Sequence, residues 1–257
     1  MMTHVVHFYL DLGWRRQYCG VEMIEQDGVT YYFIDNEYYF ARGNVYGSGE
    51  FEGERFAFFC RAVLSVLPLI GFRPDVLHLN DWQTGMIPVM LCTQYQGNEF
   101  FRGIKTVYTI HNLRYQGVFA WSFVRDLLSL DDGLFTDDKL EYYGCANFMK
   151  AGIVYSDVIT TVSPTYAREV TTSYYGERLD GLLKARANST VGILNGIDVG
   201  VYDPEECPII PAHFSAEDLA GKAECKEALQ RELGLEVRED LPLIIMITRL
   251  TEQKGID

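Results

Sequence analysis

Residues 158–170, with the sequence VITTVSPTYAREV, join a short β-rich run to a helical segment. The run 158–162 is apolar or β-branched, which is typical of a buried strand. Ser163 follows the run at once, and Pro164 follows Ser163. Serine is a favoured N-cap and proline is favoured at the first helical position, so a helix is expected to begin where the strand ends. This stretch therefore predicts a strand-to-helix turn.

The same alternation extends along the chain in both directions. Further β-rich runs, each followed by a polar turn, occupy residues 76–80, 106–110, 191–194 and 243–247. A helix is expected over 82–95, and apolar residues at three-and-four spacing predict another helix before the first run (Phe56, Phe59, Cys60, Val63, Leu64 and Leu67). Strands that alternate with helices predict the α/β class, with a parallel sheet whose strands are buried on both faces.

The first third of the chain follows a different pattern. Residues 4–10 and 29–35 are expected to form strands, joined by an irregular loop rather than by a helix. The chain is therefore expected to begin inside a domain.

A cluster of prolines separates the chain into two parts. Pro204, Pro208 and Pro211 follow the turn at 196–198, which places a domain boundary near residue 203. Beyond it only one helix, over 223–233, and one strand are expected, too little for a hydrophobic core. The predicted organisation is an N-terminal domain over 1–203 and the start of a second domain over 204–257, in a fragment of a longer protein.

Composition narrows the classes of function. Of the 257 residues 48% are hydrophobic, and 22 Lys and Arg against 36 Asp and Glu give a net charge of −14. A disordered chain is excluded, and neither nucleic acid nor an anionic membrane is an expected partner. No stretch approaches the roughly 20 apolar residues of a membrane helix. The six cysteines form no C-x-x-C pair, which indicates reduced thiols in the cytoplasm and no zinc site.

Polar residues follow two neighbouring strands of the predicted sheet. His78, Asn80 and Asp81 end the run at 76–80, and His111 and Asn112 end the next one. Ligands of open α/β sheets gather at the carboxyl ends of the strands, so these side chains are candidates for a binding site. The alternative is structural, with Asp81 as the N-cap of the following helix and His111 as an ordinary hydrogen-bonded histidine.

A third candidate follows the run at 243–247. The sequence TRLTEQKG, residues 248–255, places Arg249 and Lys254 in a turn after a predicted strand, where two cations could bind a diphosphate. The alternative is a solvated turn in which Glu252 pairs with the cations. No P-loop and no G-x-G-x-x-G element supports a phosphate site of the common kinds.

Several motifs together resemble those of bacterial glycogen and starch synthases, the ADP-glucose-dependent glycosyltransferases of family five. The matching stretches are HLNDW at 78–82, YTIHNLRYQG at 108–117, NGID at 195–198 and TRLTEQKG at 248–255. The resemblance implies the GT-B architecture, in which two Rossmann-like domains face each other across a cleft. It also implies a retaining transferase that needs no metal and moves glucose from ADP-glucose to the non-reducing 4-hydroxyl of an α-1,4-glucan.

The resemblance assigns roles to nine residues by their position in the motifs. Arg249 and Lys254 would neutralise the departing diphosphate, while Asp81 and His111 would line the sugar site. Four more would shape the pocket or its floor (Asn112, Tyr115, Gln116 and Asn195). Tyr46, in RGNVYG at 42–47, would contact sugar.

Two elements of the family are missing from this sequence. They are the N-terminal K-T-G-G-L loop and the C-terminal E-x(7)-E element, both of which hold the nucleotide sugar. The chain alone is therefore expected to transfer no glucose. Two other interpretations stay open: a non-catalytic glucan-binding fragment, which the 17 tyrosines would suit, and a related retaining transferase that uses UDP-glucose.

Overall fold

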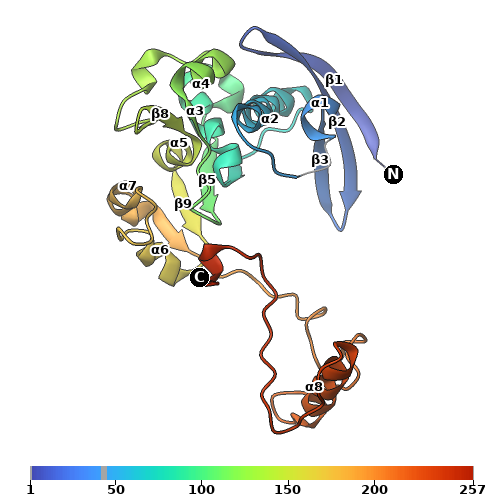
Figure 1. Cartoon of the computed structure of the whole chain (residues 1–257). Helices are drawn as coiled ribbons and strands as arrows, with labels where there is room; N and C mark the ends of the chain where they lie inside the picture. Colours follow the sequence, from blue (N-terminus) through green and yellow to red (C-terminus); the bar gives the residue numbers. More distant parts are fainter. Residues whose placement is uncertain (1, 42–44, 257) are drawn as a thin grey trace. The chain divides into compact units, whose positions relative to one another are not determined.

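The computed structural model describes residues 2–41 and 45–256, and it divides the chain into two compact units, Met1–Asn195 and Gly196–Asp257 (Figure 1). The division falls a few residues before the boundary expected near residue 203. The side chain of Gln253 is also outside the description.

The first unit is built on a parallel sheet with the strand order β10-β9-β5-β4. Its strands are β4 (Val76–Asn80), β5 (Lys105–Ile110), β9 (Val158–Thr161) and β10 (Thr190–Gly192). The register places Thr109 of β5 between Asn80 and Thr160. The predicted α/β class is confirmed.

The predicted strand-to-helix turn after β9 is also confirmed. The Oγ of Ser163 accepts a hydrogen bond from the backbone N–H of Tyr166 at 2.9 Å, and Pro164 begins α6 (Pro164–Glu169). The N-cap and the fixed φ of proline thus end the strand and start the helix in adjacent residues.

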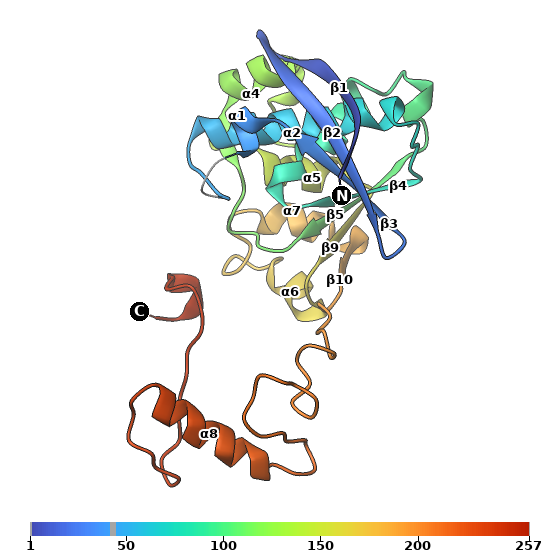
Figure 2. The ribbon, with the colours of Figure 1, turned by 90° about the vertical axis from the view of Figure 1, so that its right-hand side faces the viewer.

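Helices cover one face of this sheet. The central helices are α2 (Glu50–Leu69), α3 (Met86–Thr93) and α5 (Phe148–Tyr155). Packing is close: a Cβ on Gly152 of α5 would lie 2.3 Å from the ring carbon Cζ of the fully buried Tyr108. Helix α2 contacts α3 on one side and β1 and β3 on the other (Figure 2).

The opposite face of the sheet is open in the described part of the chain. Val76, Val158 and Val191 point there, and Val191 is 52% exposed. The prediction that these strands are buried on both faces is therefore wrong for the chain as it stands. Apolar composition alone does not show whether a second layer is present to cover the strands.

The first third of the chain forms an antiparallel sheet of β1 (Thr3–Leu12), β2 (Arg15–Gln26) and β3 (Val29–Asp35). The irregular loop predicted between β1 and β3 is wrong, because most of it is β2. Asp27 and Gly28 both have positive φ, at 53° and 78°, and form the tight turn from β2 to β3. An Asp-Gly pair between two β-rich runs is a hairpin signal that identifies β2.

Short elements complete the first unit. A small antiparallel sheet with the order β6-β8-β7 is followed by α5. Its strands and the remaining helices are β6 (Val118–Ala120), β7 (Glu141–Tyr142), β8 (Cys145–Asn147), α1 (Glu37–Phe40), α4 (Trp121–Leu128) and α7 (Asp180–Ala185). No helix among the described residues is both long enough and apolar enough to cross a membrane.

The second unit contains α8 (Ala220–Glu232), close to the helix predicted over 223–233, and the short turn η5 (Glu252–Lys254). The strand predicted over 243–247 is wrong: the segment is assigned to no strand, and Ile244 and Ile247 are 89% and 92% exposed. A strand is defined by hydrogen bonds to a neighbour, and residues 196–256 contain no second strand with which it could pair.

Candidate active site

Asp81 links the carboxyl ends of β4 and β5. Its backbone N–H donates to the carbonyl oxygen of Thr109 at 2.9 Å, and its Oδ1 accepts from the backbone N–H of His111 at 2.8 Å. Oδ1 also lies 3.5 Å from the backbone nitrogen of Asn112. The carboxylate therefore holds the start of the HNL segment against the end of β4.

The backbone of Asp81 is in the left-handed region, with φ at 54°. Asp81 stands directly before the turn η1 (Trp82–Thr84), but its side chain makes no capping bond there, so the N-cap interpretation is wrong. A non-glycine residue in this region costs on the order of 1–3 kcal/mol and persists where the surroundings hold it. At Asp81 the bonds to β5 supply that support.

His111 is exposed and joined to the end of β4 by its side chain. Its Nε2 lies 3.0 Å from Oδ1 of Asn80. A carboxamide oxygen only accepts, so the imidazole carries its proton on Nε2 in this bond. The orientation of the ring is therefore fixed by Asn80, while Asp81 fixes the backbone of the same residue.

A row of hydrogen-bonded side chains crosses the sheet next to Asn80 and His111. Nε2 of His78 lies 2.6 Å from Oγ1 of Thr109, which lies 2.5 Å from Oγ1 of Thr160. These bonds tie β4, β5 and β9 together just below the carboxyl ends. The strand ends that carry Asp81 and His111 are therefore held together by side-chain hydrogen bonds across three strands.

A buried tyrosine, Tyr108, and a half-buried one, Tyr166, lie next to the same segment. The pKa of Tyr108 is raised well above its usual value, mainly because the phenol is buried and to a smaller extent because of the charge of Asp81. Burial also raises the pKa of Tyr166, whose hydroxyl oxygen accepts from the backbone N–H of Leu113 at 3.3 Å. Both phenols therefore stay neutral.

The side chain of Gln116 bridges two other parts of the first unit. Its Nε2 donates to the carbonyl oxygen of Glu177 at 3.0 Å, and its Oε1 accepts from Nδ2 of Asn147 at 2.6 Å. Both ends of the carboxamide are therefore engaged within the chain. The predicted role of Gln116 in shaping the pocket stays a prediction, and these bonds describe how it could do so.

Asn147 is a fully buried residue that the sequence analysis did not identify. Besides its bond to Gln116, its Oδ1 accepts from the backbone N–H of Lys150 at 2.9 Å, which makes it the N-cap of α5. An asparagine directly before an apolar helical run is a recognisable capping signal. The contact with Gln116 could not be read from the sequence, since 31 positions separate the two residues.

The turn after Gln116 requires glycine. Gly117 has φ at 63°, and a Cβ there would lie 2.2 Å from Cε3 of the Trp82 indole. The carbonyl oxygen of Gly117 accepts from the backbone N–H of Phe148 at 3.0 Å. The YQG turn is therefore packed between Trp82 and the start of α5.

An open pocket of about 540 Å³ lies over this turn. Tyr115 and Gln116 of the predicted site line it, together with Trp82, Tyr142, Glu177 and Arg178. Aromatic faces beside guanidinium and carboxylate groups suit a ligand with apolar faces and many hydroxyls, such as a sugar. Asp81 and His111 are not among the lining residues, but Trp82 follows Asp81 directly in the sequence.

Of the other predicted site residues in the first unit, Asn195 and Tyr46 are exposed. Asn195 is the last residue of the first unit, and Tyr46 follows residues 42–44, which lie outside the description. Neither lines the pocket. Asn112 is half-buried, and its Oδ1 accepts from the backbone N–H of Arg114 at 3.1 Å.

Arg249 and Lys254 belong to the second unit and are both exposed. Backbone hydrogen bonds fold the segment between them into a tight turn. The N–H of Thr251 donates to the carbonyl oxygen of Arg249, and the N–H of Lys254 donates to the carbonyl oxygen of Thr251, both at 2.9 Å. That these cations act together with Asp81 and His111 stays a prediction.

Comparison with known proteins gives consistent matches over the whole chain. Residues 1–185 match the family model of the starch synthase catalytic domain. A glycogen synthase from Geobacillus thermodenitrificans is 56% identical over 256 residues, which cover 100% of this chain and 53% of that protein. A glycogen synthase from Bacillus cereus is 53% identical over 246 residues, 96% of this chain and 52% of that protein.

A solved structure matches as well. The catalytic domain of starch synthase IV from Arabidopsis thaliana, bound to ADP and acarbose, has a TM-score of 0.87 and 32% identity. The match covers 99% of this chain and 53% of that one. The chain thus spans about half the length of the curated relatives it matches.

Proposed function

The chain belongs to the starch synthase catalytic-domain family, and on that premise we propose that it serves in the synthesis of α-1,4-glucan. The reaction is transfer of glucose from ADP-glucose to the non-reducing 4-hydroxyl of the glucan, with retention at the anomeric carbon and release of ADP. The observation that carries the proposal is the bridge from the Asp81 carboxylate to the backbone of His111, which brings two motifs of the family together at one edge of the sheet.

In this proposal the residues of the strand ends position the transferred sugar. Asp81 holds the HNL segment, and His111, oriented by Asn80, lies beside the glucose or the diphosphate. Asn112, Tyr115 and Gln116 shape the pocket, Asn195 lies near the cleft floor and Tyr46 contacts sugar. The bond from C1 to the diphosphate breaks as the bond from C1 to the acceptor oxygen forms, and the acceptor proton leaves with the diphosphate.

The negative charge that develops on the leaving diphosphate needs compensation. Arg249 and Lys254 supply two positive charges from one turn, and a guanidinium can bind phosphate oxygens in a bidentate manner. We propose that this pair takes the place of a metal ion, so the reaction needs none. The two domains of the GT-B architecture would then contribute the sugar site and the diphosphate site respectively.

The nucleotide is proposed to carry adenine. The Arabidopsis starch synthase is described as bound to ADP and acarbose, and the curated relatives are glycogen synthases. UDP-glucose is the alternative donor. The six cysteines are all free, which supports a reducing compartment, and we place the protein in the cytoplasm.

A second function is binding of α-glucan without transfer. The observation in its favour is that the pocket of about 540 Å³ is lined entirely by residues of the first unit. The chain could therefore bind a glucan even where it transfers no glucose.

Incorporation of labelled glucose into glycogen tests the proposal. The chain and a version extended at both ends to the length of the relatives are each supplied with ADP-glucose or with UDP-glucose. We expect incorporation from ADP-glucose by the extended protein and none by the chain alone. Preference for UDP-glucose would overturn the donor assignment, and inactivity of both proteins with retained starch binding would favour the binding function.

A further inference from the structure

A second pocket adjoins the first. It has a volume of about 490 Å³ and is lined by Asp137, Glu141, Tyr143 and Lys150, among others. Tyr142 and Arg178 line both pockets. The two hollows therefore lie on either side of a shared wall formed by these two side chains.

The backbone at this wall is strained. Glu177 and Arg178 have positive φ, at 46° and 67°, although neither is glycine. Tyr143, with φ at 50°, begins the two-residue turn between β7 and β8. The strain is held in place because Gln116 Nε2 and the Tyr142 hydroxyl both donate to the carbonyl oxygen of Glu177, at 3.0 and 3.2 Å. Backbone strain of this kind concentrates at ligand-binding sites.

Arg178, which lines both pockets, lies beside Tyr143, which lines the second. The guanidinium carbon of Arg178 lies 5.4 Å from the ring centroid of Tyr143, and the rings of Tyr142 and Tyr143 meet edge to face at 4.9 Å. Tyr143 is nevertheless 72% exposed. An exposed ring held beside a guanidinium offers a flat face for stacking and donors for hydroxyl groups.

The charges of the second pocket indicate a neutral ligand. Asp137, Asp138 and Glu141 line it and would repel an anion. Lys150, whose Nζ lies 3.9 Å from Oδ1 of Asp137, and Arg178 offset two of these three charges, so the lining keeps a net negative charge. Carboxylates and a guanidinium can instead bind the hydroxyls of an uncharged sugar.

We propose that the two pockets form one extended site for an α-glucan chain, in which Tyr143 and Arg178 bind the glucose units that lie farther from Asp81 and His111. This inference rests on the proposed function, since it assumes that the chain binds α-glucan. It adds that affinity depends on glucan length and that the second pocket causes this dependence.

Titration calorimetry with maltose and with maltoheptaose tests the inference on the chain as it is. The decisive variant is Tyr143→Gly, because glycine suits a positive φ and the fold should be kept. We expect the wild type to bind maltoheptaose about tenfold more tightly than maltose, and Tyr143→Gly to lose most of that difference. Tyr143→Phe keeps the ring and should keep the difference.

A matched control distinguishes the site from general loss of aromatic surface. Tyr174 is 83% exposed and lines neither pocket, so Tyr174→Gly should leave both affinities unchanged. A length dependence that survives Tyr143→Gly, or an equal loss for both sugars, overturns the extended site and leaves the proposed function standing. Absence of binding to either sugar by the wild type overturns the site and the acceptor assignment together. Failure of glucose transfer by the extended protein, with an intact length effect, counts against the proposed reaction alone.

Discussion

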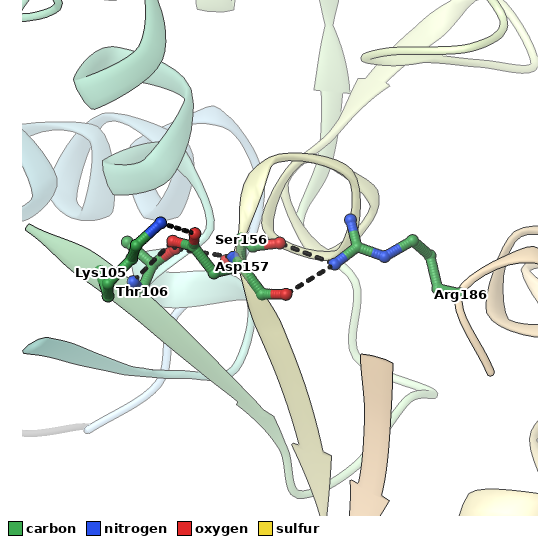
Figure 3. Close-up of polar contacts among 5 residues, drawn as sticks. All are labelled: Lys105, Thr106, Ser156, Asp157 and Arg186. Atoms are coloured by element: carbon green, nitrogen blue, oxygen red, sulfur yellow. Dashed lines mark hydrogen bonds and ion pairs between the residues drawn. The ribbon is translucent and has the colours of Figure 1, made fainter. Parts of the chain in front are cut away.

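The two ends of the parallel sheet use polar residues in opposite ways. At the amino end, the carboxylate of Asp157 accepts from Lys105 Nζ at 2.8 Å and from the backbone N–H and the hydroxyl of Thr106, both at 2.9 Å (Figure 3). Arg186 donates to the carbonyl oxygens of Ser156 and Asp157, at 2.7 and 3.3 Å. These bonds lock the start of β9 to the start of β5 and to the segment after α7.

Polar groups at the carboxyl end are also hydrogen-bonded within the chain, through Asp81, His111 and Thr109. His111 is however exposed, Asp81 has a strained backbone, and Trp82, the residue after Asp81, lines an open pocket. We therefore propose that polar groups at the amino end stabilise the fold, whereas those at the carboxyl end fix a geometry for a ligand. The comparison predicts that substitutions at the first end change stability alone, and those at the second end change binding or transfer with little change in stability.

Removal of the Asp157 side chain should have the largest effect. Asp157→Ala leaves the buried N–H and hydroxyl of Thr106 without their acceptor, so we expect the free energy of unfolding to fall by about 3 kcal/mol. Urea denaturation measures this loss. Affinity for maltoheptaose, measured under conditions where the variant is folded, should be unchanged. A stability loss below about 1 kcal/mol would contradict the structural role.

The same carboxylate predicts a pH dependence. Burial alone would raise the pKa of Asp157, but the hydrogen bonds from Lys105 and Thr106 outweigh it and hold the pKa below its usual value. Stability from a lowered pKa is present above the unfolded value, about 3.9, and is lost as the pH falls through the folded value. The difference in unfolding free energy between wild type and Asp157→Asn should therefore be constant from pH 7 to 5 and shrink below pH 4. A difference that grows on acidification would mean that the pKa is raised instead.

The sequence predicts those features that depend on neighbouring residues and misses those that depend on residues far apart in the chain. Ser163 and Pro164 predicted the turn after β9 because capping acts within a few residues, and the rule for strand ends placed Asp81 near His111. The strand at 243–247 depends on a partner strand, and the bond from Asn147 to Gln116 joins residues 31 positions apart. Neither is encoded locally. The missed strand β2 is different, because the Asp27-Gly28 turn was visible in the sequence.

Asp81→Asn tests the carboxyl end of the sheet in the same way. Asparagine has the same shape as aspartate, so it bears the same backbone strain, and it keeps an oxygen to accept from His111; we therefore expect the unfolding free energy to change by less than about 1 kcal/mol. The lost charge should lower glucose transfer by the extended protein by about tenfold, since a hydrogen bond to a charged group is stronger than a neutral one. Asp157→Asn, assayed in parallel, should leave transfer unchanged. Equal stability losses for the two variants would show that the ends do not differ as proposed.

Asn147 both stabilises the fold, as the N-cap of α5, and contacts a pocket residue, Gln116. Two substitutions separate these roles. Asn147→Ser keeps an oxygen to cap α5 but removes the bond to Gln116, whereas Asn147→Ala removes both. We expect thermal or urea unfolding to show losses of about 1 and about 2 kcal/mol respectively. Because the bond to Gln116 positions one wall of the pocket, both variants should weaken maltose binding by the same modest factor, about twofold. Loss of stability in both variants without any change in maltose affinity would place Asn147 with Asp157, among the residues that only stabilise the fold.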